Sequence, residues 1–344
     1  MGQGIDLAAY DLRAIAADLG ELQVALGIGT WNISGNGTSS RILFELAAER
    51  PTTIRALIAD SPMLPSPDAF SLAPSTLDAA INQLATSCAA EPGCAARTPD
   101  VRAAIDEAAR KLDAEPVQLE VAATDAGASI GHPVKVVVDG AALLRWIRAS
   151  LAAQGGEGAA TAIQTVLRVL DGRLTADDPM PIALATDPDD CIGIALGCDR
   201  ISFGALYSIE CRDLAQSLDR AKLTEAIAGR PAWADLFAPE TVLAPCAAWS
   251  VPPSGAFPAS NPTLGIRSLL LRGRLDPFTI PQAQLDGIAN DPATSLIEVP
   301  NQSYNVLGFT ECPRAIRNAW LDATSGPPAD TSCLAGIPAI SLQP

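Results

Sequence analysis

The stretch that most constrains the fold of this chain runs from Thr30 to Arg41 and reads TWNISGNGTSSR. A short apolar strand leads into a Gly-rich turn, and the turn opens a helix. This is the context of a nucleophile elbow, a sharp turn that lifts a catalytic side chain above a parallel sheet. In the pattern Gly-x-Ser-x-Gly, Gly35 fits the first position, Gly37 replaces the serine and Ser39 replaces the second glycine. The sequence therefore predicts the turn without its nucleophile.

Apolar periodicity predicts further elements on both sides of this turn. Residues 5–26 carry leucine and isoleucine at spacings of three and four, which is typical of an amphipathic helix that Gly27 ends. We expect strands over 31–34, 54–59, 266–271 and 295–299, and helices over 38–50, 283–289 and 313–323. The order strand, helix, strand after residue 31 implies a right-handed parallel unit.

The middle of the chain differs from both ends in composition and in its apolar pattern. It is rich in Ala, punctuated by Pro and mostly helical in pattern, with alternating valines at 117–121 and 134–138 that predict a small hairpin. We expect helices over 77–90, 101–112, 141–153 and 159–170. Because this span interrupts one parallel unit and returns to another, we expect core segments over 1–64 and 262–344 and an inserted helical lid over 65–261.

Composition excludes several classes of protein. The net charge of −16, from 39 acidic and 23 basic residues, argues against binding to nucleic acid, which needs clusters of Lys and Arg. No uninterrupted apolar run of about 18 residues occurs, so no membrane span is expected. The 344 residues are 48% hydrophobic, which is enough for a sizeable core.

Eight cysteines accompany one histidine, His132, and this ratio counts against a zinc site. Spacing suggests three pairs, Cys88 with Cys94, Cys191 with Cys198, and Cys312 with Cys333, which leaves Cys211 and Cys246 to pair with each other; the alternative is eight buried free thiols. An even, locally paired set favours an oxidising compartment. The first residues, however, show no basic region and no apolar core of a signal peptide.

Several stretches, in order along nearly the whole chain, resemble the α/β-hydrolase family of secreted actinobacterial tripeptidyl aminopeptidases. They are residues 18–32 before the elbow, Gly35 and Arg41 within it, Cys88–Cys94, Cys246–Trp249, Gly273–Pro277 with Thr279, and Asp330–Cys333. The resemblance implies an α/β-hydrolase-type parallel sheet with a large inserted, mostly helical lid, an extracytoplasmic or secreted location, and peptide or small acyl substrates. It implies no metal and no organic cofactor.

The departures from that family concern its catalytic triad. The serine position is Gly37, and the segment that carries the family's histidine corresponds to residues 301–305, where Tyr304 takes the histidine position. Only the acid, Asp276, persists. The family's early strands and oxyanion-hole loop precede the helix with which this chain begins, so we expect a partial sheet with an edge at Trp31–Ser34. Three alternatives follow: upstream sequence that is missing here covers the edge, which is the hypothesis we favour, a partner covers it, or the product is unstable.

These substitutions predict impaired catalysis. Glycine supplies no nucleophile, and tyrosine, with a pKa near 10, is a poor base at neutral pH. Loss of a triad serine alone costs on the order of a millionfold in turnover. Asp276 has a second interpretation as an Asp-Pro turn residue, and Tyr304 either hydrogen-bonds Asp276 or packs as a half-buried phenol.

The alternative is an active serine exopeptidase or esterase with a relocated nucleophile. Candidates flank the turn: Ser39 or Thr38 foremost, then Ser40 and Ser34. His132 lies in a Gly-His-Pro sequence of the lid, where we expect a loop. A third possibility is a gene fragment without function.

Overall fold

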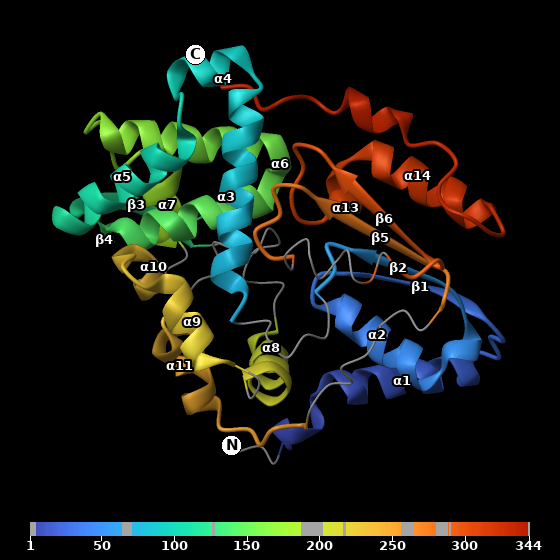
Figure 1. Cartoon of the computed structure of the whole chain (residues 1–344). Coiled ribbons are helices and arrows are strands. Elements are labelled where there is room, and N and C mark those ends of the chain that lie inside the picture. Colours follow the sequence, from blue (N-terminus) through green and yellow to red (C-terminus); the bar gives the residue numbers. More distant parts are fainter. Residues whose placement is uncertain are drawn as a thin grey trace.

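The computed structural model describes residues 5–63, 71–125, 128–186, 202–215, 218–255, 265–279, 288 and 290–342. A four-stranded parallel sheet forms one side of the molecule (Figure 1). Its strands are β1 (Trp31–Asn36), β2 (Ile54–Asp60), β5 (Ser268–Gly273) and β6 (Thr294–Val299), and they lie in the order β1-β2-β5-β6. The predicted α/β class with a parallel sheet is confirmed.

Position in the sheet explains the pattern of each strand. The interior strands β2 and β5 are almost continuously apolar and are buried on both faces, as parallel strands between helical layers are. β1 lies at the edge and alternates: Ile33 is buried, whereas Asn32 and Ser34 are exposed. The strand runs two residues past its expected end because Gly35 and Asn36 continue the pairing with β2.

Helices cover both faces of the sheet. On one face, α1 (Leu12–Ala25) and α2 (Ser39–Glu49) pack Ala16, Leu43 and Phe44 against Leu57 and Leu270. On the other face lie α13 (Val306–Phe309), α14 (Glu311–Asp322) and a 3-10 turn, Ser332–Gly336, near the chain end. Short 3-10 turns also occur at Leu7–Ala9 and Pro51–Thr53.

The first helix is shorter than the expected 5–26. It begins at Leu12, because the Asp11 carboxylate accepts a hydrogen bond from the backbone N–H of Ala14 at 2.8 Å and caps the helix there. The predicted stop is confirmed, since Gly27 adopts a positive φ of 66° directly after the last turn.

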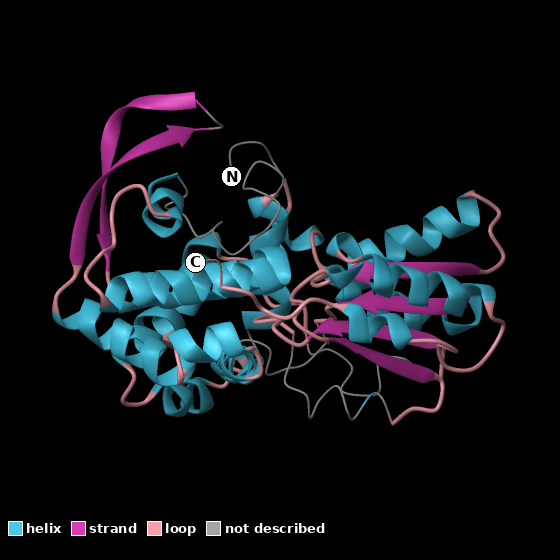
Figure 2. Ribbon diagram, turned by 90° about the horizontal axis from the view of Figure 1, so that it is seen from above, coloured by secondary structure: helices cyan, strands magenta, loops and turns pink. Residues whose placement is uncertain are grey.

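A second group of elements lies beside the sheet (Figures 1 and 2). It comprises α3 (Ala73–Ala89), α4 (Pro92–Arg97), α5 (Val101–Ala114), the hairpin β3 (Val117–Asp125) and β4 (Ala128–Val138), α6 (Gly140–Leu170), α7 (Pro179–Thr186), α8 (Phe203–Ile209), a π-helical turn at Glu210–Leu214, α9 (Arg220–Ile227), α10 (Pro231–Phe237) and α11 (Pro239–Trp249). These elements share one hydrophobic cluster, which Leu275 and Ile340 also join.

Two expectations in this region were wrong. The predicted helices 141–153 and 159–170 form one helix, α6, which continues through the intervening glycines although Gly155 adopts a positive φ of 53°. Apolar residues on both halves, such as Ile147 and Ile163, join the same cluster. His132 lies within β4, not in a loop, because strand pairing continues on both sides of an irregularity near Ala122.

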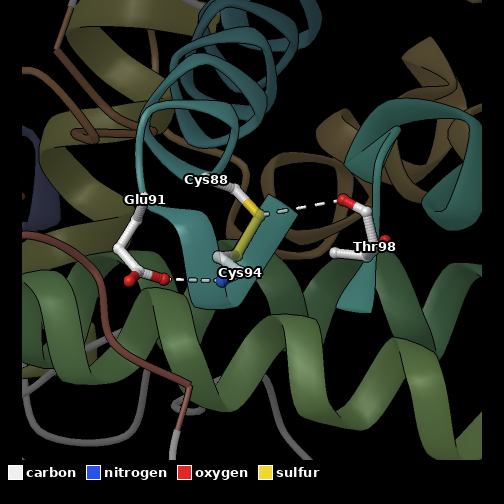
Figure 3. The surroundings of a disulfide bond; sticks show 4 residues. All are labelled: Cys88, Glu91, Cys94 and Thr98. Atoms are coloured by element: carbon white, nitrogen blue, oxygen red, sulfur yellow. Dashed lines mark hydrogen bonds between the residues drawn. A yellow bond between two sulfur atoms is a disulfide. The ribbon is translucent and has the colours of Figure 1, made fainter. Parts of the chain in front are cut away.

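Three of the expected disulfides form: Cys88–Cys94, Cys211–Cys246 and Cys312–Cys333. Figure 3 shows the first, where the Glu91 carboxylate accepts a hydrogen bond from the backbone N–H of Cys94. The expected pair Cys191–Cys198 and nearly all of the expected helix 283–289 lie outside the described residues. Among the described helices, none is long and apolar enough to cross a membrane.

Candidate functional site

The turn after β1 has the geometry of an elbow around Gly37. Gly37 adopts a φ of 53°, in the left-handed region that favours glycine, and Thr38 returns to helical angles at the start of α2. The backbone N–H of Gly37 donates to the carbonyl of Asp60 at 3.0 Å, which extends the pairing of β1 with β2 into the turn.

The phenol of Tyr304 occupies the space that a side chain at Gly37 would need. A Cβ atom built on Gly37 would overlap the Tyr304 hydroxyl and would lie 2.8 Å from Cζ of the ring. Gly37 and Tyr304, 267 positions apart in the sequence, are therefore brought into direct contact, and the absence of a side chain at Gly37 is what allows the phenol to lie there.

A carboxylate that the sequence analysis missed fixes the loop carrying Tyr304. Asp60, the last residue of β2, accepts hydrogen bonds from the backbone N–H groups of Val306 at 3.1 Å and Leu307 at 2.8 Å. The neighbouring Ser61 hydroxyl accepts one from the N–H of Asn305 at 2.9 Å. The signal available in the sequence was an acidic residue at the end of a strand paired with the elbow strand.

Burial perturbs this carboxylate. Asp60 is 2% exposed, and burial raises its pKa from 3.8 to about 6, although the N–H groups of Leu307 and Val306 act in the opposite direction. The charge of Asp276 adds to the increase. Asp60 is thus a buried acid that titrates near neutral pH, directly beneath the Tyr304 loop.

The Asp276 carboxylate hydrogen-bonds with residues of its own turn. Its carboxylate accepts hydrogen bonds from the N–H groups of Phe278 at 2.8 Å and Thr279 at 3.1 Å, and from the Thr279 hydroxyl. Burial raises the pKa of Asp276, and these hydrogen bonds act against the increase. Among the described residues, no hydrogen bond joins Asp276 to Tyr304; the phenol instead packs with Phe278 edge-on, with ring centroids 5.8 Å apart.

Tyr304 is not a base. Burial raises its pKa above the ordinary value near 10, and the charges of Asp276 and Asp60 raise it further. The Tyr304 side chain is therefore a neutral phenol at every physiological pH.

The hydroxyls next to Gly37 make local hydrogen bonds. Ser39 donates to the carbonyl of Asn36 at 2.6 Å, Ser40 donates to the carbonyl of Gly37, and Thr38 donates to the sulfur of Met63 at 3.4 Å. None of these contacts is with a base. His132, exposed on β4, lies in the hairpin at the end of the molecule remote from the sheet (Figure 2).

The sequence analysis also missed two acidic residues, Glu210 and Asp213, whose charges act on Arg41 of α2. Arg41 of α2 is 4% exposed, and burial lowers its pKa to about 10, while the charges of Glu210 and Asp213 act in the opposite direction. Burial raises the pKa of Glu210 to about 7, with Arg41 and Arg148 opposing the increase. Glu210 and Asp213 both belong to the π-helical turn, a rare element that is frequent at functional sites.

Among the described residues, no group of three His, Cys, Asp or Glu side chains is placed to hold a metal ion. The chemistry that the described site offers comes from Tyr304, from the buried carboxylates Asp60 and Asp276, and from the charges around Arg41.

No family model matches the chain, and no curated protein matches it. Among solved structures, it is similar to an epoxide hydrolase of the α/β-hydrolase superfamily from hot-environment metagenomes, with 15% identity over 93% of this chain and 76% of that one and a TM-score of 0.32. It is also similar to a point mutant of an epoxide hydrolase from Bacillus megaterium, with 13% identity over 93% and 78% and a TM-score of 0.35. Scores this low carry no argument about activity.

Proposed function

We propose that this chain is an α/β-hydrolase-like protein that has lost acyl-transfer catalysis and binds short peptides or small acyl compounds. In this proposal residues 65–261 act as a lid over a core made of 1–64 and 262–344, as the resemblance to secreted tripeptidyl aminopeptidases implies. The observation that carries the proposal is the phenol of Tyr304, which lies where the nucleophile's side chain would stand at Gly37.

The remaining positions support the same conclusion. A triad needs a nucleophile, a base that takes its proton and an acid that orients the base. Gly37 has no side chain, the raised pKa of Tyr304 excludes it as a base, and Asp276 hydrogen-bonds its own turn. The three disulfides suggest an extracellular location, which suits a binding protein derived from a secreted peptidase.

The catalytic half of the proposal is tested with a fluorophosphonate probe on the purified full chain. We expect no labelled serine in the wild type, and none in the matched Ser39→Ala variant. Labelling of Ser39, Ser40 or Ser34 in the wild type would show a relocated nucleophile and overturn the proposal. The Gly37→Ser/Tyr304→His variant is run beside them; labelling at residue 37 would show that the elbow still positions a serine.

The binding half needs a separate measurement. Titration calorimetry with an N-terminally free tripeptide amide and with its N-acetylated counterpart should show binding of at least one compound at millimolar concentration or below. No heat with either, from a chain that unfolds cooperatively, contradicts the binding role. A chain that cannot be obtained as a cooperatively unfolding product would support the gene-fragment alternative.

A further inference from the structure

The last residues of the chain connect the two parts of the molecule. The elements from α3 to α11, called the helical segment below, share one hydrophobic cluster, and the sheet has clusters of its own. Of the described residues outside the helical segment, Leu275, Ile340 and Leu342 join its cluster. In Figure 1 the chain passes from α14, on the side of the sheet, to its C-terminal end on the side of the helical segment.

The stretch that leads to this end is fixed to the sheet side. Cys333 forms a disulfide with Cys312 of α14. Leu334 and Ile337 pack against the cluster on the sheet that includes Trp320 of α14. Because the disulfide is covalent, this anchor stays with α14 whatever the residues after it do.

The crossing from the sheet side to the helical segment is short. Ile337 is extended and Pro338 has a fixed φ, so the three steps from Ile337 to Ile340 span about 10 Å with little freedom. The Pro338 carbonyl accepts a hydrogen bond from the side-chain amide of Asn301 at 3.1 Å. Asn301 lies three positions before Tyr304, so the crossing contacts the base of the loop that carries the phenol. Ile340 then lies fully buried in the cluster of the helical segment.

A polar connection joins the same two parts at the start of α1. The Asp213 carboxylate accepts a hydrogen bond from the N–H of Leu12 at 2.9 Å, and Arg212 pairs with Asp11 at 3.0 Å. Two parts of a chain move relative to each other by default unless a large apolar interface joins them. The few apolar residues that the sheet side inserts into the helical segment therefore decide how firmly the two parts are held together.

We propose that residues 337–342 are a strap that holds the helical segment closed against the sheet. Burial of one isoleucine shifts such an equilibrium roughly tenfold to hundredfold toward the closed form. When Ile340 leaves the cluster, the helical segment turns about its polar connection at the start of α1. The contact that then separates lies beside the elbow: the guanidinium carbon of Arg148 is 4.4 Å from the centroid of the Phe278 ring, and that ring packs against Tyr304. Release of the strap thus exposes the surroundings of Tyr304.

The test is the size of the full chain in solution by small-angle X-ray scattering. A compact chain of 344 residues has a radius of gyration of about 20 Å, and Ile340→Asp should increase it by about 1 Å or more without changing the far-UV circular dichroism. Ala339→Asp adds the same charge at an exposed neighbour; it is the matched control and should keep the wild-type radius. If Ile340→Asp does not fold, Ile340→Ala decides in its place, because it removes the buried side chain without adding a charge.

Hydroxyl-radical footprinting locates the opening. The side chains of Phe278 and Tyr304 should be oxidised about twofold faster or more in the Ile340 variant than in the wild type, whereas Trp320, buried on the sheet side, should keep its rate. The amide of Leu12, bonded to Asp213, should stay protected from hydrogen exchange in both.

Three outcomes would overturn the proposal: a wild-type radius in the folded Ile340 variant, unchanged oxidation of Phe278 and Tyr304, or an expansion that is accompanied by loss of helical circular dichroism in Ile340→Ala. None of these readouts depends on catalysis or on peptide binding.

Discussion

At the scale of single residues, one contact defines the candidate site: the Tyr304 phenol against the bare α-carbon of Gly37. Glycine satisfies two demands there, a positive φ and the absence of a Cβ atom. Gly37 and Tyr304 are therefore physically coupled, because a larger residue at either position would need the other to move.

This coupling is measurable. Gly37→Ala should lower the free energy of unfolding by about 2–4 kcal/mol, since it adds both left-handed backbone strain and an overlap with the phenol. In the Tyr304→Phe variant, which lacks the overlapping hydroxyl, Gly37→Ala should lower the free energy of unfolding by about 1 kcal/mol less than it does in the wild type. Urea unfolding of the wild type, the two single variants and the double variant gives this difference. Strictly additive effects would show that the two residues do not touch.

Asp60 predicts a pH dependence of stability. Its pKa is 3.8 when unperturbed and about 6 in the folded chain, so the folded chain holds the proton more tightly between those values. The Asp60 contribution to stability is therefore largest below about pH 4, is lost as the pH rises to about 6, and amounts to about 3 kcal/mol in total.

The comparison of the wild type with Asp60→Asn isolates this contribution. The wild-type free energy of unfolding minus that of the variant should fall by about 3 kcal/mol between about pH 4 and pH 7. Urea titrations at a series of pH values measure it. If this difference in the free energy of unfolding stays constant or grows with pH, the pKa of the Asp60 carboxyl is not raised in the folded chain.

At the scale of elements, the π-helical turn Glu210–Leu214 joins the helical segment to the core. The Asp213 carboxylate accepts a hydrogen bond from the N–H of Leu12 at 2.9 Å, and Arg212 pairs with Asp11 at 3.0 Å. The Cys211–Cys246 disulfide ties the same turn to α11. The start of α1 is thus held by a turn that lies 201 residues later in the sequence.

The disulfides should differ in their effect on stability. The chain-entropy model assigns roughly 3.8 kcal/mol to a loop of 35 residues and roughly 2.2 kcal/mol to one of 6. Cys211→Ala/Cys246→Ala should therefore destabilise the chain about 1.5 kcal/mol more than Cys88→Ala/Cys94→Ala. Urea unfolding under non-reducing conditions checks the order, and the reverse order would contradict it.

At the scale of the whole molecule, the chain combines separate hydrophobic clusters with a large excess of negative charge. The group of elements from α3 to α11 has its own hydrophobic cluster, and a further hydrophobic cluster lies on each face of the sheet. The net charge of −16 repels itself across the folded molecule, and added salt screens such repulsion.

Salt should therefore raise the melting temperature. Raising NaCl from about 10 mM to about 300 mM at neutral pH is expected to increase Tm by about 2 °C or more, because screening favours the compact state. Scanning calorimetry measures the change, and an equimolar series of uncharged osmolyte is the control. A Tm that falls with salt would show that attraction between opposite charges, such as the Arg212–Asp11 ion pair, outweighs the repulsion.

Much of the fold followed from local pattern. The strand ending near Gly37, the stop of α1 at Gly27 and the pairing of Cys88 with Cys94 depend on residues close together in the chain, whose periodicity, positive-φ preference and spacing are visible in the sequence. The merging of two expected helices into α6 was not predicted, because apolar residues of both halves pack into one cluster and the helix continues through the central glycines, with Gly155 at a positive φ.

What the sequence determined by itself was the chemistry available at positions 37 and 304, because glycine has no side chain and a tyrosine phenol is a poor base at neutral pH in any conformation. What only the tertiary structure decided was which distant groups meet. Asp60 lies beneath the Tyr304 loop, Glu210 faces Arg41, and β1 lies at the edge of the sheet, because strand order and helix packing set those contacts across hundreds of residues.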